Sequence, residues 1–134
     1  MQVQPYLNFN GRCEEALDFY RRALGAEVTT LMRFKDSPDP AVVTPGTEQK
    51  VMHSSMRIGD ATILASDAQC QGQTEFKGIS LTLTVPDAAE AERRFGALSD
   101  GGQVQMPLTE TFFSPRFGMV ADRFGVTWMI LVEH

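Results

Sequence analysis

The sequence is poor in cysteine, histidine and tryptophan, and it has no long apolar run. Its 134 residues include two cysteines, two histidines and one tryptophan. Cys13 and Cys70 form no C-x-x-C pair and no spacing typical of a metal site, so we expect free thiols in a reducing cytoplasm. No apolar run reaches the roughly 18 residues that a membrane-spanning helix needs, and the N-terminus has no secretion-signal pattern. We therefore expect no membrane partner.

Basic residues and nucleotide-binding motifs are also scarce. Twelve lysines and arginines stand against 17 aspartates and glutamates, which gives a net charge of −5. Because phosphate binding needs a basic surface, we expect no nucleic-acid partner. The motifs G-x-G-x-x-G, G-x-x-x-x-G-K-[ST], G-x-S-x-G and H-E-x-x-H are absent. The first strand-to-helix turn holds one glycine, Gly11, so we expect no nucleotide-like cofactor there.

The chain does contain an internal repeat. A strand, a helix, a glycine turn and a second strand follow one another in both halves, and Phe95 occupies in the second half the place of Phe19 in the first. In each half a glycine, Gly59 or Gly125, precedes a last apolar strand. The length suits one domain with a real core. We therefore expect a single domain over 1–134 with two similar modules, about 1–67 and 78–134.

Hydrophobic periodicity places the elements of the first module. Strands are predicted at 3–9, 27–34, 51–58 and 61–66, with a long loop over 36–50. Asn10 is predicted to cap a helix that ends at Gly25. Apolar side chains recur along this helix with a spacing of three to four residues, at Cys13, Ala16, Leu17, Tyr20, Ala23 and Leu24.

The second module repeats this order after a polar linker at 68–77. The segment 79–85 alternates apolar and hydroxyl residues, which predicts a strand with one face on a core. Asp87, with Glu90 three residues later, predicts a helix start. Ala88, Ala91, Phe95 and Leu98 should face inward, and strands follow at 103–108, 116–121 and 126–132. Each half is thus βαβββ. We expect an α+β fold in which two βαβββ modules form a curved mixed sheet around a cavity.

Two stretches resemble a known superfamily. One reads PYLNFNG at 5–11 and EALDFY at 15–20, and the other reads RFG at 116–118 and DRFGV at 122–126. The chain resembles the vicinal oxygen chelate superfamily, also called the glyoxalase/bleomycin resistance/dioxygenase superfamily. The match is to its PhnB-like branch, whose members often carry the label "3-demethylubiquinone-9 3-methyltransferase". The resemblance implies the duplicated fold and a homodimer.

The same resemblance lets us ask whether this chain holds a metal. Metal-using members place four side chains, mostly His and Glu, on the first and last strands of the two halves. The equivalent positions here are Gln4 or Pro5, Ile63 or Ala65, Ser80, and Met129; strand alternation favours Gln4. This set offers at most one weak ligand to a divalent ion. We therefore expect no metal, which counts against the metal-dependent reactions of the superfamily.

The function that we expect is metal-independent binding of a small molecule whose identity the sequence does not give. The segment 109–118 joins aromatic side chains with Arg116, so it could stack on a ligand and pair with an anion. The alternative for this segment is an edge of the core or a dimer contact. The predicted lining residues are Gln4, Tyr6, Asn8, His53, Ser80, Thr82 and Met129, with Phe113, Arg116 and Phe117 near the mouth.

Two other functions remain open at the sequence level. One is an enzyme, with a metal held by unexpected ligands or with metal-free acid-base chemistry at His53. His53 is the one catalytic candidate, since the second histidine, His134, is the last residue, and His53 could equally be a structural histidine. The other is a drug-sequestering protein of the bleomycin-binding kind, for which the acidic charge favours a cationic ligand.

Overall fold

The structure is a computed structural model that describes residues 1–39, 45–67 and 75–133. Parts of the predicted loop at 36–50 and linker at 68–77 lie outside these residues, as do Cys70 and His134. The chain divides into two compact units, Met1–Thr74 and Glu75–His134, and each is described by itself. Within the described residues, no helix combines the length and apolar character needed to cross a membrane.

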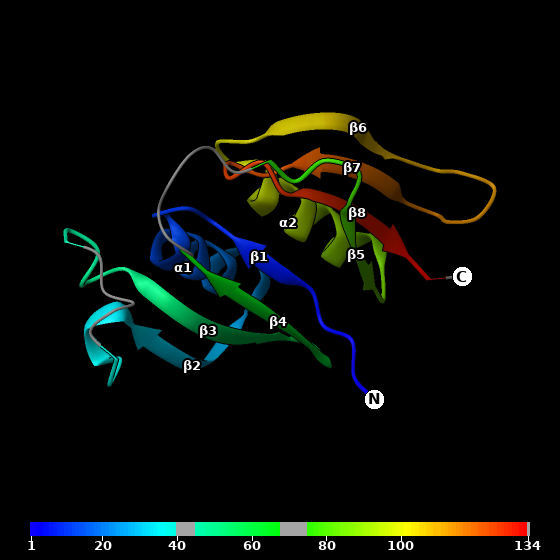
Figure 1. Cartoon of the computed structure of the whole chain (residues 1–134). Helices are drawn as coiled ribbons and strands as arrows, with labels where there is room; N and C mark the ends of the chain where they lie inside the picture. The colour runs from blue at the N-terminus through cyan, green and yellow to red at the C-terminus, as the bar shows by residue number, and fades with distance from the viewer. Residues whose placement is uncertain (40–44, 68–74, 134) are drawn as a thin grey trace. The chain divides into compact units, whose positions relative to one another are not determined.

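Unit 1 is a βαβββ module, as the periodicity predicted (Figure 1). Its strands hydrogen-bond in the order β1-β4-β3-β2, with β1 parallel to β4 and the other pairs antiparallel. The third and fourth strands have the predicted bounds, whereas the first is shorter than 3–9. The described elements are β1 (Tyr6–Asn8), α1 (Cys13–Leu24), β2 (Glu27–Arg33), the 3-10 turn η1 (Phe34–Asp36), β3 (Val51–Ile58) and β4 (Ala61–Ser66).

Unit 2 repeats this topology with its own sheet. The strand order is β5-β8-β7-β6, again with the first and last strands of the module parallel. The α+β class and the two βαβββ modules are therefore confirmed, and the strands form two four-stranded mixed sheets. The elements are β5 (Ser80–Val85), α2 (Ala88–Ser99), β6 (Gln103–Thr109), β7 (Phe117–Ala121) and β8 (Thr127–Val132).

Helix α1 packs its apolar stripe against one face of its sheet. Every residue of the predicted stripe is buried, and so is Phe19. The Cys13 thiol lies 3.8 Å from the Ser54 hydroxyl of β3, which marks the sheet face that the helix covers. Gly25 adopts a left-handed conformation with φ of 68°, where a side chain would be strained, and it ends the helix as predicted.

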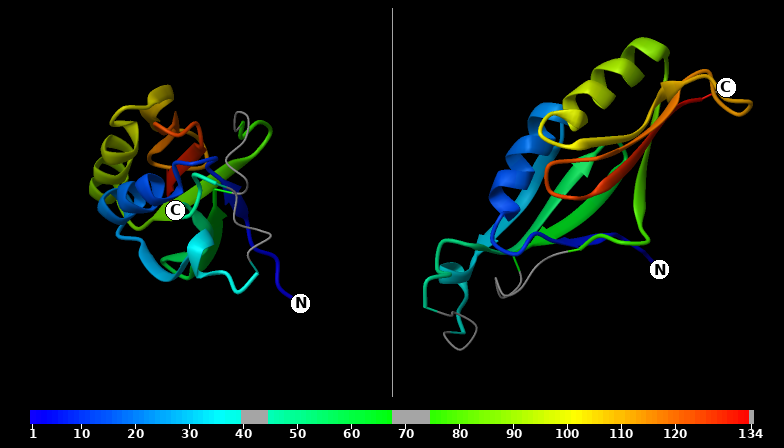
Figure 2. Two further views of the ribbon diagram at one scale, coloured as in Figure 1. Left: turned by 60° about the vertical axis from the view of Figure 1, so that its left-hand side comes forward. Right: turned by 90° about the horizontal axis from the view of Figure 1, so that it is seen from above.

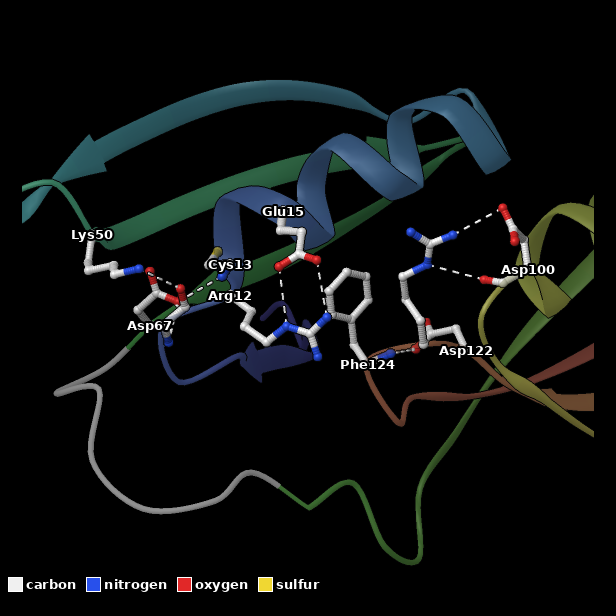
Figure 3. A network of polar contacts seen from close by, with 10 residues as sticks. Arg12, Cys13, Glu15, Lys50, Asp67, Asp100, Asp122 and Phe124 are labelled. Atoms are coloured by element: carbon white, nitrogen blue, oxygen red, sulfur yellow. Dashed lines mark hydrogen bonds and ion pairs between the residues drawn. The ribbon is translucent and has the colours of Figure 1, made fainter.

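The start of α1 differs from the prediction. Asn10 does not cap the helix: its own backbone is left-handed, with φ of 49°, and the helix begins three residues later. The buried carboxylate of Asp67, which follows β4, accepts hydrogen bonds from the amides of Gly11 and Cys13, both at 2.7 Å (Figure 3). It also accepts one from Val51 at 2.9 Å. A distant residue thus holds the turn before α1 and satisfies the first amide of the helix, which has no partner within the helix.

Helix α2 starts as the sequence predicted. The Asp87 side chain accepts a hydrogen bond from the Glu90 amide at 2.8 Å, while the Glu90 carboxylate pairs with arginines of its own helix. Ala91 and Leu98 are fully buried on the sheet side. A Cβ added to Gly118 of β7 would lie 2.8 Å from the Phe95 ring, so glycine lets the helix approach. Figure 2 shows each helix running along its own sheet.

Candidate functional site

Each sheet has one face covered by the helix of its module, and we call the opposite face the open face. In unit 1, Ala65 of β4 pairs with Leu7 of β1 on one side and with Ser54 of β3 on the other. All three are buried on the helix side. Successive residues of a strand alternate between faces. The open face therefore carries Tyr6, which pairs with Leu64, and Ser55, which pairs with Leu64 from the other side.

The open face of unit 1 brings two predicted site residues together. Tyr6 and His53 lie on β1 and β3, and their rings are 5.9 Å apart between centroids. The Tyr6 hydroxyl is 3.4 Å from Nδ1 of His53, a long hydrogen-bonding distance. Met32 of β2 pairs with His53 in register, so it adds a thioether to the same face. An imidazole and a phenol side by side can donate and accept protons.

The other predicted residues of unit 1 lie just before β1 or at its end. Gln4 is half-buried and Pro5 is exposed; both precede β1, and the Pro5 carbonyl accepts a hydrogen bond from Leu64 at 2.9 Å. Asn8 is exposed, and its side-chain oxygen accepts a hydrogen bond from the Asn10 amide at 3.0 Å. Asn8 therefore shapes the turn before α1. The ligand-binding roles of these residues stay predictions.

The prediction for the last strand of unit 1 is wrong. Ile63 and Ala65 are 5% and 0% exposed, and Ala65 pairs with Leu7 on the helix side. Leu64 takes their place on the open face, because it pairs with Tyr6 as Met129 pairs with Thr82 in unit 2. The correction replaces one apolar side chain with another, so this position still offers no metal ligand.

In unit 2 the predicted residues of β5 and β8 share the open face. Ser80 pairs with Thr127, and Thr82 pairs with Met129. The Thr82 hydroxyl is 3.9 Å from the Met129 sulfur, to which it can donate. Met129 in turn pairs with Met119 of β7, and Met119 pairs with Met106 of β6.

Met106 and Met119 were not among the predicted site residues. Strand alternation could have found Met119, because its neighbours Gly118 and Val120 are buried on the helix side. Met106 could not be found in this way. The register of β6 shifts on both sides of it, so alternation along that strand does not predict the face.

Three phenylalanines form an edge-to-face aromatic cluster at one end of the open face of unit 2. Phe117 pairs with Leu131 and is only 6% exposed. Phe113 meets it edge to face, with centroids 5.0 Å apart, and Phe112 meets Phe113 at 5.2 Å. Phe112 is 97% exposed. The predicted segment therefore presents aromatic surface to solvent.

A buried hydroxyl holds the turn that carries these rings. Ser114 is fully buried, and its hydroxyl lies 2.7 Å from the carbonyls of both Arg116 and Val132. It also accepts a hydrogen bond from the Val132 amide at 3.1 Å. Thr111 closes the turn with a 2.9 Å backbone bond to the Ser114 carbonyl. The sequence alone gives no sign that Ser114 fixes this turn.

Arg116 has protein partners in this structure. Its guanidinium donates to the Pro115 carbonyl at 3.1 Å and lies 4.0 Å from the Glu92 carboxylate of α2. It is therefore directed toward the helix of its module. Its predicted pairing with a ligand anion stays a prediction.

The residues at the superfamily's metal positions do not fit a hard divalent ion. With the correction above they are Gln4 or Pro5, Leu64, Ser80 and Met129, which include no imidazole or carboxylate. Divalent ions such as Zn²⁺, Mn²⁺ and Fe²⁺ are held by nitrogen, carboxylate or thiolate donors. The described residues also contain no cluster of three or more His, Cys, Asp or Glu side chains that could hold a metal.

Comparisons with known proteins agree with this duplicated fold. A family model described as 3-demethylubiquinone-9 3-methyltransferase matches residues 1–131. Protein YjdN of Escherichia coli is 36% identical, over 98% of this chain and 95% of its own. The crystal structure of protein PA1353 from Pseudomonas aeruginosa is 42% identical, with a TM-score of 0.88 over 99% of this chain and 98% of its own.

Two more solved structures place the branch and the fold. A PhnB protein from Bacillus cereus, described as a putative 3-demethylubiquinone-9 3-methyltransferase, is 27% identical, with a TM-score of 0.83 over 98% of this chain and 99% of its own. A glyoxylase/bleomycin resistance protein/dioxygenase domain from Frankia is 11% identical, with a TM-score of 0.73 over 100% and 98%, which shows the fold alone. The chain therefore belongs to the PhnB-like 3-demethylubiquinone-9 3-methyltransferase family, a branch with the glyoxalase/bleomycin resistance/dioxygenase fold.

Proposed function

We propose that this protein binds a small organic molecule on the open faces of its sheets and does so without a divalent metal. One observation carries the proposal. On each open face, polar side chains that can orient a ligand stand beside large apolar ones that can bury it, such as His53 beside Met32 and Thr82 beside Met129. Small-molecule sites typically combine an apolar lining with a few placed polar groups.

A thermal-shift screen with compounds of different charge tests this proposal. A true ligand at 100 times its dissociation constant stabilises the folded state by about 2.7 kcal/mol. The variants Tyr6→Phe and Thr82→Val remove one hydroxyl from each open face, and Arg57→Gln, on an exposed ion pair, is the control. We expect a stabilising compound whose effect falls in at least one face variant and persists in the control. A panel without any stabilising compound would contradict the proposal.

Elemental analysis tests the metal-free part. Protein purified without chelator should carry no divalent ion in a 1:1 ratio to chain. A bound ion that is lost in the His53→Ala variant would contradict it, because a metal would then be held by ligands outside the superfamily's usual positions.

A second function has one observation in its favour, the contact between Tyr6 and His53. A histidine beside a phenol can act as a general acid or base toward a bound molecule. If the protein is an enzyme, His53→Gln should abolish turnover of a bound compound and leave its thermal shift nearly intact. A binding protein, including one that sequesters a cationic drug, would return the compound unchanged.

Two further parts of the prediction remain proposals. We propose a cytoplasmic protein, since the buried Cys13 is a free thiol. We also propose a homodimer, and the half-exposed apolar side chain of Val104 on the edge strand β6 gives it a surface. Sedimentation of the wild type against Val104→Lys would test it, since a lysine at a buried interface should shift the equilibrium toward the monomer.

A further inference from the structure

We propose that the open face of unit 2 is selective for an uncharged, flat aromatic molecule, which lies on a row of three methionines and against an aromatic wall. This inference rests on the proposed function and names the ligand class of that site. The row consists of Met106, Met119 and Met129, and we call it the methionine row.

The register of the sheet builds the methionine row. Met106 pairs with Met119, and Met119 pairs with Met129, so the three side chains lie opposite one another on adjacent strands. Cβ atoms of directly paired residues lie about 5 Å apart. The row crosses two gaps between strands and is therefore about 10 Å long. This length suits a fused ring system of two or three rings.

An aromatic wall stands beside the methionine row. Phe117 lies two residues from Met119 on β7, so both side chains are on the open face. Phe113 packs edge to face on Phe117 and is 44% exposed, so part of its side chain is available to a ligand. Because the fully buried Ser114 bonds the turn to β8, this wall exists before a ligand binds.

The open face of unit 2 carries no charged side chain within residues 80–132, which disfavours ionic ligands. None of the residues paired across the open face of unit 2, within 80–132, carries an ionisable side chain. A charged ligand would lose its hydration there without gaining a partner. Hydroxyls line one edge of the row along β5, where Ser80, Thr82 and Thr84 alternate with inward-facing residues. They can hydrogen-bond to a hydroxyl or carbonyl on the rim of a ring.

The chemistry of methionine favours an aromatic ligand over a merely apolar one. Thioether sulfur interacts favourably with aromatic rings, and its flexible side chain adapts to their outline. A phenylalanine edge adds an aromatic contact that a saturated ring cannot make. Leucine has nearly the same volume and apolar surface as methionine but lacks the sulfur, so a methionine-to-leucine change isolates this contribution.

Calorimetric titration with 2-naphthol and with 2-decalol, its saturated counterpart, tests the inference. Both are neutral and carry one hydroxyl, so they differ mainly in aromaticity. We expect 2-naphthol to bind at least about 5-fold more tightly. The double change Met119→Leu/Met129→Leu should weaken 2-naphthol by about 2- to 10-fold and leave 2-decalol nearly unchanged. Met56→Leu, on the buried helix side of unit 1, should change neither.

Several outcomes would overturn the inference. Equal affinity for the two compounds would mean that the face is only hydrophobic, and undetectable 2-naphthol binding would remove the ligand class. Tighter binding of 2-naphthalenesulfonate than of 2-naphthol would contradict the uncharged requirement. Diluting the protein alone gives a heat signal if a dimer dissociates. If this signal disappears in the double variant, the face binds a second copy of the chain instead of a ligand. The proposed function fails separately, if the thermal-shift screen yields no ligand of any class.

Discussion

Asp67 and Asp87 each cap the helix of their module, but only one of them can be recognised in the sequence. Asp87 immediately precedes α2 and bonds to an amide three residues later. Asp67 follows β4 and bonds to Cys13, 54 residues earlier in the chain. A local pattern can predict the first and not the second. The sequence therefore points to Asn10 as the cap of α1, although Asn10 turns the chain before the helix begins.

Replacing Asp67 should cost more stability than replacing Asp87. Asp67→Ala leaves three amides at the buried start of α1 and β3 without their acceptor, so we expect a loss of about 3 kcal/mol in the free energy of unfolding. Asp87→Ala, the matched control, loses one exposed capping bond and should cost about 1 kcal/mol. Urea unfolding measures both. Equal losses would show that Asp67 does not organise unit 1.

The Glu14–Arg33 pair should make a small, pH-dependent contribution. The Arg33 guanidinium, 2.5 Å away, lowers the pKa of the Glu14 carboxyl below its ordinary value of 4.5. A lowered pKa in the folded state gives stability that is present above the ordinary value of 4.5 and is lost as pH falls through the folded value. Because Glu14 is half-exposed, Glu14→Gln should cost less than about 1 kcal/mol at pH 7.

A pH series of unfolding experiments on wild type and Glu14→Gln checks this. The difference between the two proteins should shrink as pH falls from 5 to below the folded pKa of Glu14. A difference that stays constant over this range would mean that the carboxylate charge is not what stabilises the pair.

Cys13 should make the protein less stable in alkali. Burial raises the pKa of its thiol to about 12, whereas an exposed thiol ionises near 8.5. The unfolded state therefore loses this proton first, and stability falls as pH rises above about 8.5, by about 2 kcal/mol at pH 10. Comparing wild type with Cys13→Ala at pH 7 and pH 10 isolates the effect. An equal loss in both proteins would contradict it.

At the scale of elements, the sequence predicted which segments form strands and helices better than it predicted faces. Alternation and turn residues located β3 and β4 with their observed bounds. The predicted face of β4 is wrong because counting from the turn glycine does not fix a face. Ala61 and Thr127 both stand two residues after a glycine, but directly paired residues of two strands share a face. Ala61 pairs with Ile58, which is on the helix side with Ser54, whereas Thr127 pairs with Ala121, which is on the open face with Met119.

The turn over 110–116 is the element on which the aromatic wall depends. Ser114→Ala removes a buried hydroxyl that bonds this turn to β8, and we expect a loss of about 1–3 kcal/mol. Ser99→Ala removes a hydroxyl that bonds back to the carbonyl of Phe95 within α2, so it should stay within about 0.5 kcal/mol of wild type. Chemical denaturation of both variants checks the prediction, and an unaffected Ser114→Ala would show that the turn is held by other contacts.

At the scale of the whole molecule, duplication explains why each unit has its own open face with candidate site residues. Each module covers one sheet face with its own helix and leaves the other without a helix. Residues at the same place in the repeat, such as Tyr6 and Thr82, meet an apolar partner on the last strand of their module, Leu64 or Met129. The sequence predicted these residue types, but only the strand register shows which of them share a face.

Methionine methyl NMR tests the central claim most directly, because the seven methionines sample both open faces and the core. Met32 reports on unit 1, the methionine row on unit 2, and the fully buried Met56 serves as the internal control. On addition of a stabilising compound, we expect the methyl signals of Met32 or of the methionine row to shift while that of Met56 stays in place. Shifts confined to Met56, or no shift of any methionine on either open face, would contradict binding on the open faces.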